Sequence, residues 1–227
     1  MKLEPSMRFH PTALKRYLLL PLLVAATLTR TWGQAADSPI VFQGPEAVTA
    51  TLIDPPTAGL GRSEGSSNTE NSQWLKVEFH YAVKPKPPLP FVESVEFRVW
   101  IEGRDLYAPE ATTADGISVV LTASVTYINV QATSDGYGSF YVHPSTMQRY
   151  STKSGASDFG DRFNVHVEAY VSGTKVDYFD KNKSQDPNWY QSMKAIPNLV
   201  YRQDQCVFML TDPSRYPQIK PSFSSGQ

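Results

Sequence analysis

The stretch VEFHYAVKPKPPLPFVESVEFRVWI, residues 77–101, decides the fold class. On each side of its proline-rich centre, every second residue is apolar and most of the residues between them are polar or charged. A period of two is the signature of a β-strand with one buried face and one solvated face. The stretch therefore predicts two strands that feed one core, joined by an extended crossing at KPKPPLP, residues 84–90. The apolar set is Val77, Phe79, Tyr81, Val83, Val95, Phe97, Val99 and Ile101.

Comparable segments, separated by turn residues, occupy the rest of the chain. We expect strands at 47–53, 74–83, 94–102, 116–130, 139–142, 163–171, 174–179, 199–202 and 206–210. Turns are expected at 134–138 (SDGYG) and 172–173, and short helical turns at 144–150, with Ser145 as a cap, and near 187–193. Even spacing without a long helical period predicts an all-β fold. The expected architecture is an immunoglobulin-like or fibronectin-like antiparallel β-sandwich with short helical turns.

The amino end has the pattern of an export signal. Lys15 and Arg16 precede the apolar run YLLLPLLVAATL, residues 17–28. That run is shorter than the roughly 20 residues of a bilayer span and matches the roughly 7–15 residues of a signal-peptide core. We expect residues 1–35 to be cleaved near Gln34 or Ala36, which leaves a soluble protein in the periplasm, at the cell surface or outside the cell. An uncleaved short anchor is the alternative.

Behind that segment we expect a strand and a flexible loop at 36–73. The sandwich body spans 74–220, forms a single domain with residues 40–73, and is followed by a disordered tail at 221–227. The chain has one cysteine, Cys206, so no internal disulfide can support the fold. Because Cys206 stands in the apolar run CVFML, we expect it to be a small buried hydrophobe.

Charge narrows the range of partners. The chain has 21 basic and 22 acidic residues, and residues 1–35 hold five of the basic and one of the acidic ones. Removing them leaves 16 basic and 21 acidic residues, a net charge of −5. Nucleic acids and anionic membranes attract concentrated positive charge. We therefore expect neither as a partner, and no membrane span in the mature chain.

Two motifs are candidates for chemistry. His166 and Glu168 share one face of an expected strand, opposite Val165 and Val167, so we expect them to face solvent rather than form a site. A calcium loop would place oxygen ligands at Asp180, Asn182, Ser184 and Asp186. Its sixth position is Gln185 instead of Gly and its twelfth is Gln191 instead of Glu, so an ordinary polar loop is favoured. We expect no enzyme activity, no cofactor and no metal.

The polar faces of the expected strands carry the candidate binding surface. Trp100 and Tyr170 lie on these faces, and His80 and Arg98 accompany them. Exposed aromatic rings stack on sugars or mark protein interfaces. The alternative is that loops of the chain cover them, with Trp100 packed beneath the proline-rich crossing.

Four stretches carry a family resemblance: residues 91–110 (FVESVEFRVWIEGRDLYAPE), 137–150 (YGSFYVHPSTMQRY), 161–171 (DRFNVHVEAYV) and 204–217 (DQCVFMLTDPSRYP). They resemble a family of exported verrucomicrobial proteins, one member of which is immunoglobulin-like and linked to type IV pilus-like machinery. The resemblance implies a non-catalytic sandwich at the cell envelope whose partners are envelope or pilus-assembly proteins. It defines no catalytic residues. Binding of glycans through the exposed aromatics is the alternative function.

Overall fold

The computed structural model describes residues 38–56, 73–112, 116–151, 164–182, 186–211 and 215–221. The expected signal peptide, most of the loop before residue 73 and nearly all of the expected tail lie outside the described residues. Within the described ranges, none of the helices has the length and apolar character that a membrane span requires.

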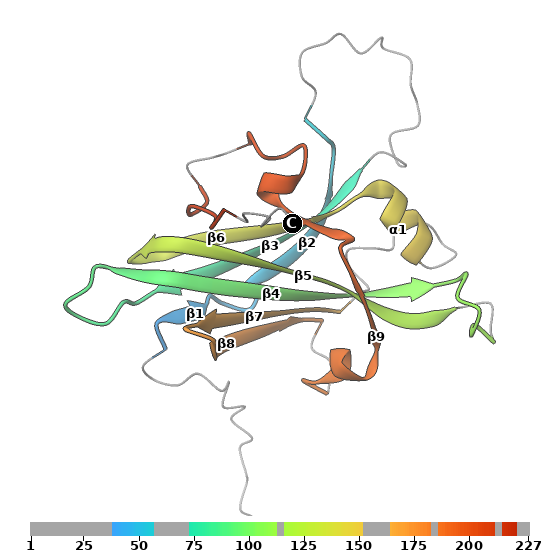
Figure 1. Cartoon of the computed structure of the whole chain (residues 1–227), viewed down its shortest axis with the longest axis horizontal. Coiled ribbons are helices and arrows are strands. Elements are labelled where there is room, and N and C mark those ends of the chain that lie inside the picture. Colours follow the sequence, from blue (N-terminus) through green and yellow to red (C-terminus); the bar gives the residue numbers. More distant parts are fainter. Residues whose placement is uncertain are drawn as a thin grey trace, which may run out of the picture. The chain divides into compact units, whose positions relative to one another are not determined.

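Two sheets form the body (Figure 1). In the first sheet, one side of β3 (Trp74–Val83) pairs with β1 (Ile40–Phe42) and with β2 (Val48–Ile53). The other side of β3 pairs with β6 (Thr133–Val142), and β6 pairs in turn with β10 (Val200–Arg202). The second sheet has the order β8 (Thr174–Lys181), β7 (Val165–Val171), β4 (Phe91–Asp105), β5 (Ile117–Gln131) and β9 (Lys194–Pro197). All described pairs are antiparallel except the parallel pair of β5 and β9. The all-β sandwich is confirmed, with one parallel pair that the sequence did not predict.

The opening stretch forms the centre of the core, as predicted. Phe79 and Tyr81 of β3 face Phe97 of β4 across the two sheets, with ring centroids 4.6 and 4.7 Å apart. All three side chains are fully buried, so their burial contributes about 2–3 kcal/mol each. The proline-rich residues 84–90 carry the chain from one sheet to the other.

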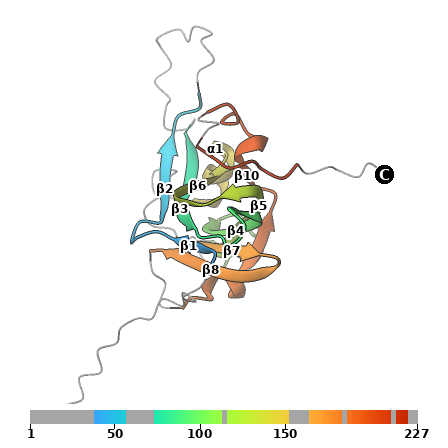
Figure 2. The same ribbon diagram turned by 90° about the vertical axis from the view of Figure 1, so that its left-hand side faces the viewer.

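The chain covers several of its own sheet edges. The Phe42 N–H donates to Asp177 Oδ2 at 2.8 Å, which ties β1 to the outer strand β8 of the other sheet. The carboxyl-terminal segment covers part of the β5 edge: Ile128 N–H donates to the Gln218 carbonyl at 2.9 Å, and Lys220 N–H to the Thr126 carbonyl at 2.7 Å. Figure 2 views the molecule from the side of β1, β2 and β8.

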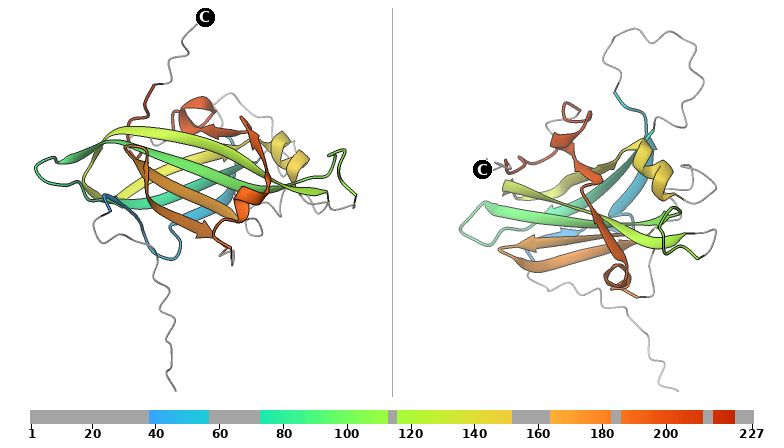
Figure 3. Two further views of the ribbon diagram at one scale, coloured as in Figure 1. Left: turned by 60° about the horizontal axis from the view of Figure 1, so that its bottom comes forward. Right: turned by 45° about the vertical axis from the view of Figure 1, so that its right-hand side comes forward.

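Three short helices complete the described part: α1 (Pro144–Tyr150), η2 (Trp189–Ser192) and η3 (Gln203–Gln205). The prediction of α1 is confirmed, but its cap is His143 rather than Ser145, because the Ser145 N–H donates to His143 Nδ1 at 3.1 Å. Figure 3 gives two further views of the fold, in which β9, the strand after η2, joins the second sheet as its edge strand beside β5.

Two local predictions were wrong. Residues 134–138 lie inside β6 instead of forming a turn, because Gly136 and Gly138 stand where the rings of Tyr81 and Phe79 need space. Residues 206–210 form turns instead of a strand. Phe208 alone in that run is buried, against Trp74 and Tyr141, and Cys206 packs half-buried at its edge.

Candidate binding groove

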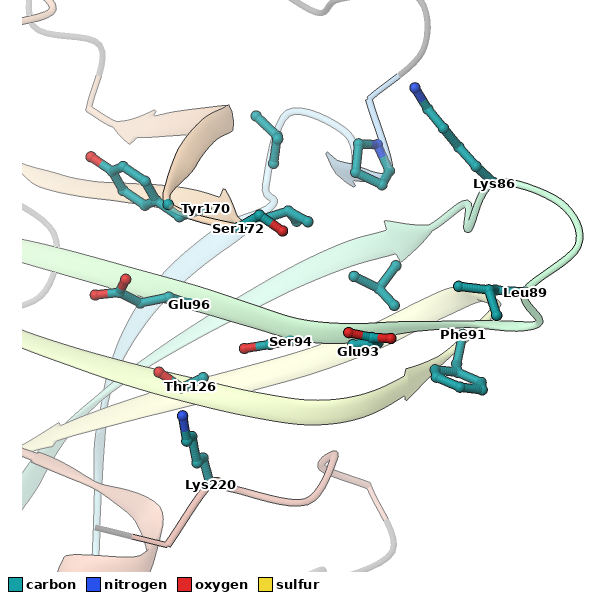
Figure 4. A pocket seen from close by; sticks show the side chains of 15 residues that line it. Lys86, Leu89, Phe91, Glu93, Ser94, Glu96, Thr126, Tyr170, Ser172 and Lys220 are labelled. Atoms are coloured by element: carbon teal, nitrogen blue, oxygen red, sulfur yellow. The ribbon is translucent and has the colours of Figure 1, made fainter.

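A groove of about 630 Å³ lies over one end of the second sheet (Figure 4). Its walls come from the proline-rich crossing, the first half of β4, the end of β7 and the carboxyl-terminal segment. Figure 4 shows Lys86 and Lys220 on opposite sides of it. The lining therefore mixes cations, carboxylates, hydroxyls and a few apolar groups. Its main members are Lys86, Leu89, Phe91, Glu93, Ser94, Glu96, Thr126, Tyr170, Ser172 and Lys220.

Tyr170 has two side-chain partners at this groove. Its hydroxyl donates to Glu168, and the guanidinium of Arg98 lies over its ring, 4.1 Å from the ring centroid. Arg98 in turn donates from Nε and Nη2 to the two carboxylate oxygens of Glu96, at 2.8 and 3.1 Å. Burial, assisted by the Glu168 carboxylate, raises the pKa of Tyr170 to about 12. Tyr170 therefore stays neutral at physiological pH, with one ring face occupied by Arg98.

Beneath Tyr170 lies a buried polar cluster that the sequence placed in solvent. His166 and Glu168 are 1% and 2% exposed. His166 Nδ1 lies 2.7 Å from Asp180 Oδ1, and its Nε2 lies 3.2 Å from Glu168 Oε1, off the angle of a direct hydrogen bond. Glu168 also accepts from Tyr190 at 2.9 Å and from Lys175 at 2.8 Å.

Charge pairing outweighs burial in this cluster. Burial disfavours the charged imidazole of His166, but the carboxylates of Asp180 and Glu168 raise its pKa overall. Burial likewise disfavours ionised Glu168, but His166, Lys175 and two tyrosine hydroxyls hold its pKa well below the usual value. The cluster therefore favours the charged form of both His166 and Glu168. It does not line the groove, so it supports Tyr170 from behind rather than meeting a ligand.

Helix η2 explains why this polar face is buried. Trp189 donates from Nε1 to Asp180 at 3.2 Å, and Tyr190 stacks on His166 with ring centroids 4.4 Å apart. Tyr190 also packs on Trp100, with centroids 4.6 Å apart. Trp100 is therefore covered by the chain itself, which was the alternative to an exposed binding surface. The cover is η2 rather than the proline-rich crossing, which is a correction.

His80 belongs to a different surface. It lies on the outer face of the first sheet, where its ring stacks on Tyr137 with centroids 4.6 Å apart and its Nε2 contacts Asp135. Arg215 covers the Tyr137 ring at 4.0 Å. Of the four predicted surface residues, the structure brings together Arg98 and Tyr170, while Trp100 lies under η2 and His80 lies on the other sheet.

The weak calcium-ligand candidates do not converge in the described part. Asp180 points toward His166 and Trp189, and Asp186 Oδ1 accepts the Asn188 N–H at 2.8 Å. Asn182 takes a left-handed backbone with φ of 68°, and Ser184 lies outside the described residues. No group of three or more His, Cys, Asp or Glu side chains suited to a metal occurs within the described ranges.

Most of the groove was not recognised from the sequence. Ser94 and Glu96 stand at the polar positions of a predicted strand, a signal that marks a solvated face but not a hollow. Lys86, Thr126 and Lys220 come from three separate segments, which only the folded chain brings together.

Comparison with known proteins identifies the family and the fold. A protein-family model matches residues 46–223, which is most of the chain. No curated protein matches the sequence. The crystal structure of a protein from Akkermansia muciniphila, a verrucomicrobial organism, is similar with a TM-score of 0.60 and 17% sequence identity, covering 81% of this chain and 93% of that one. At this identity the likeness shows the fold alone. The chain therefore belongs to the family whose model spans residues 46–223, and it has the β-sandwich fold seen in the Akkermansia protein.

Proposed function

We propose that this chain is an exported, non-catalytic β-sandwich module that binds protein partners of the cell envelope through the groove beside Tyr170. The observation that carries the proposal is the hydrogen-bonded and stacked Glu96–Arg98–Tyr170 unit at the wall of an open groove with mixed polar and apolar lining. Preorganised side chains lose little freedom on binding, so they favour recognition. Family membership supports a non-catalytic β-rich module, and the sequence resemblance to exported verrucomicrobial proteins motivates the envelope setting.

The structure favours a protein partner over a glycan. A sugar platform needs an open ring face, whereas Arg98 covers one face of Tyr170 and Tyr190 packs against Trp100. The predicted pair of exposed aromatic rings is therefore not available as a joint stacking surface. An assembly of the type IV pilus-like kind is the first partner to test.

In the native host, a photo-crosslinking residue at the exposed groove position Glu93 tests the proposal. We expect a discrete covalent adduct with one envelope protein, identified by mass spectrometry, that weakens in the double variant Arg98→Ala, Tyr170→Ala. The same crosslinker at Gln148, exposed on α1 outside the groove, is the matched control. Equal labelling from both positions, or an adduct with glycan instead of protein, would overturn the proposal.

Export is tested on the same material. The amino terminus of the protein recovered from the envelope or medium should begin near Gln34 or Ala36. Recovery of the chain with residues 1–33 intact in the cytoplasm would contradict export.

A further inference from the structure

Strand β2 has an outer edge that no strand of the described part pairs with. The His80 N–H donates to the Ala47 carbonyl at 2.7 Å, and the register pairs Val48 with Phe79. Hydrogen-bonding direction alternates along an antiparallel strand. The backbone N–H and C=O groups of Val48, Ala50 and Leu52 therefore point away from β3 and toward the outer edge.

Space lies beside this edge. A groove of about 380 Å³ separates residues 45–51 from residues 179–182 at the end of β8. Figure 2 shows β2 running away from β8, so none of the described strands of the second sheet lies beside its later residues. An added strand can therefore approach β2 in the plane of the first sheet.

Within its described residues, β2 lacks the sequence features that usually protect an edge from pairing. Natural edge strands are blunted by lysine, proline or bulges. The sequence of β2, VTATLI, contains no charged residue and no proline, and four of its six residues are β-branched. Strand β5 in the second sheet, by contrast, has β9 and the segment around Ile219 along its side.

The sequence of β2 is complementary to itself. With two copies antiparallel about Ala50, each Val48 lies opposite Leu52 and each Thr49 opposite Thr51 of the other copy. Threonine pairs and aliphatic pairs across strands are favourable, and no like charges meet within the strand. The outward groups of Val48, Ala50 and Leu52 then pair with those of Leu52, Ala50 and Val48 of the second copy. An isologous contact of this kind closes as a dimer.

From this geometry we propose that β2 is a self-association edge, through which two copies of this chain join their first sheets into one continuous sheet. The occupant of the edge is a second copy of this chain. This surface is separate from the groove beside Tyr170, so either proposal can fail without the other.

Acidic residues on both sides of β2 predict how dimerisation depends on ionic strength. In this register Glu46 of one copy lies opposite Asp54 of the other, and both residues are exposed. The two acidic pairs oppose association, and salt screens them. Dimerisation should therefore strengthen as ionic strength rises, unlike a contact held by salt bridges.

Sedimentation velocity over a concentration series, on the chain expressed with its own amino-terminal segment, is the first experiment. We expect a monomer–dimer equilibrium. Glu46→Lys should lower the dimer dissociation constant severalfold at low salt, because it places a lysine opposite Asp54. Asp204→Lys, the same charge change beside β10 at the far edge of the first sheet, is the control and should have no such effect.

Ala50→Pro tests the strand contact directly. The Ala50 N–H points outward, so proline there keeps the ladder with β3 and removes two hydrogen bonds from the dimer. We expect the dissociation constant to rise about tenfold or more. A monomer at all concentrations in the unchanged protein, or a dimer that neither Glu46→Lys nor Ala50→Pro alters, would overturn the proposal.

The register has its own test, in a Cys206→Ser background. Mixing Thr49→Cys and Thr51→Cys proteins under mild oxidation should give a covalent dimer in higher yield than either protein alone, because these two positions face each other across the contact. Equal yields from the mixture and from each single variant would contradict this register.

Discussion

Trp100 shows how the surroundings of one residue decide its role. On the sequence it is an aromatic residue at a polar position of a strand, open to two interpretations. In the fold it packs against His166 and Tyr190, with ring centroids 5.5 and 4.6 Å away. Its contribution is therefore to packing between the second sheet and η2, not to a binding face.

Trp100→Ala should lower the free energy of unfolding by about 2–3 kcal/mol, because it leaves a cavity under Tyr190 in a half-buried site. Chemical denaturation measures this change. Tyr107→Ala, at a side chain that is 77% exposed, is the control and should stay within about 0.5 kcal/mol of the unchanged protein. Similar effects for both variants would show that η2 does not pack on Trp100.

At the scale of elements, β6 illustrates a competition between turn residues and cross-strand packing. Asp, Gly and Tyr in SDGYG are typical of a hairpin, yet β6 runs straight through them and pairs with β3. Gly138 lies opposite Phe79, and Gly136 lies opposite Tyr81. The two glycines leave space for the aromatic rings of β3, and a side chain at either position would occupy that space.

Gly138→Ala should destabilise the protein by about 1–3 kcal/mol or more, because a Cβ there would stand 2.1 Å from the Phe79 ring. Gly44→Ala, which would meet no atom within 4 Å, controls for glycine replacement, although its φ of 75° adds a smaller strain. The double variant Gly138→Ala, Phe79→Leu should recover part of the loss by removing the ring. Thermal melting of these three variants measures the effect. Equal melting temperatures for Gly138→Ala and the unchanged protein would show that the Phe79 ring does not need the space at Gly138.

At the scale of the whole molecule, stability should depend on pH through the buried cluster. The folded-state pKa of His166 is raised, so its contribution is complete below the unfolded value of about 6.5 and is lost as pH rises through the folded value. The folded-state pKa of Glu168 is lowered, so its contribution is present above about 4.3 and is lost as pH falls. The pair therefore stabilises the fold most between about pH 4.5 and 6.5.

His166→Gln isolates this contribution. The difference in free energy of unfolding between the unchanged protein and the variant should be largest near pH 5.5 and shrink above neutral pH. Groups common to both proteins, such as the buried Asp177, cancel in the difference. Urea titrations from pH 5 to 9 measure it. A difference that stays constant over this range would mean that folding does not raise the pKa of His166, and a difference that grows with pH would mean that folding lowers it.

The sequence by itself determined the central strands and the core, although it did not predict β1 or β9. Alternation in residues 77–101 predicted β3 and β4 and their buried sides, because side chains on a strand point to opposite faces in turn and the pattern is local. It also predicted α1 and the hairpin between β7 and β8.

Only the tertiary structure decided which polar faces meet water. The alternation of residues around Glu168 predicts a solvent-facing side chain. In the fold, Tyr190 from a later segment covers Glu168 and donates a hydrogen bond to it. The same holds for the groove, whose walls come from distant segments, and for the open edge of β2. Periodicity reports the two sides of a strand, whereas cover, hollows and free edges arise from contacts between residues that no local pattern connects.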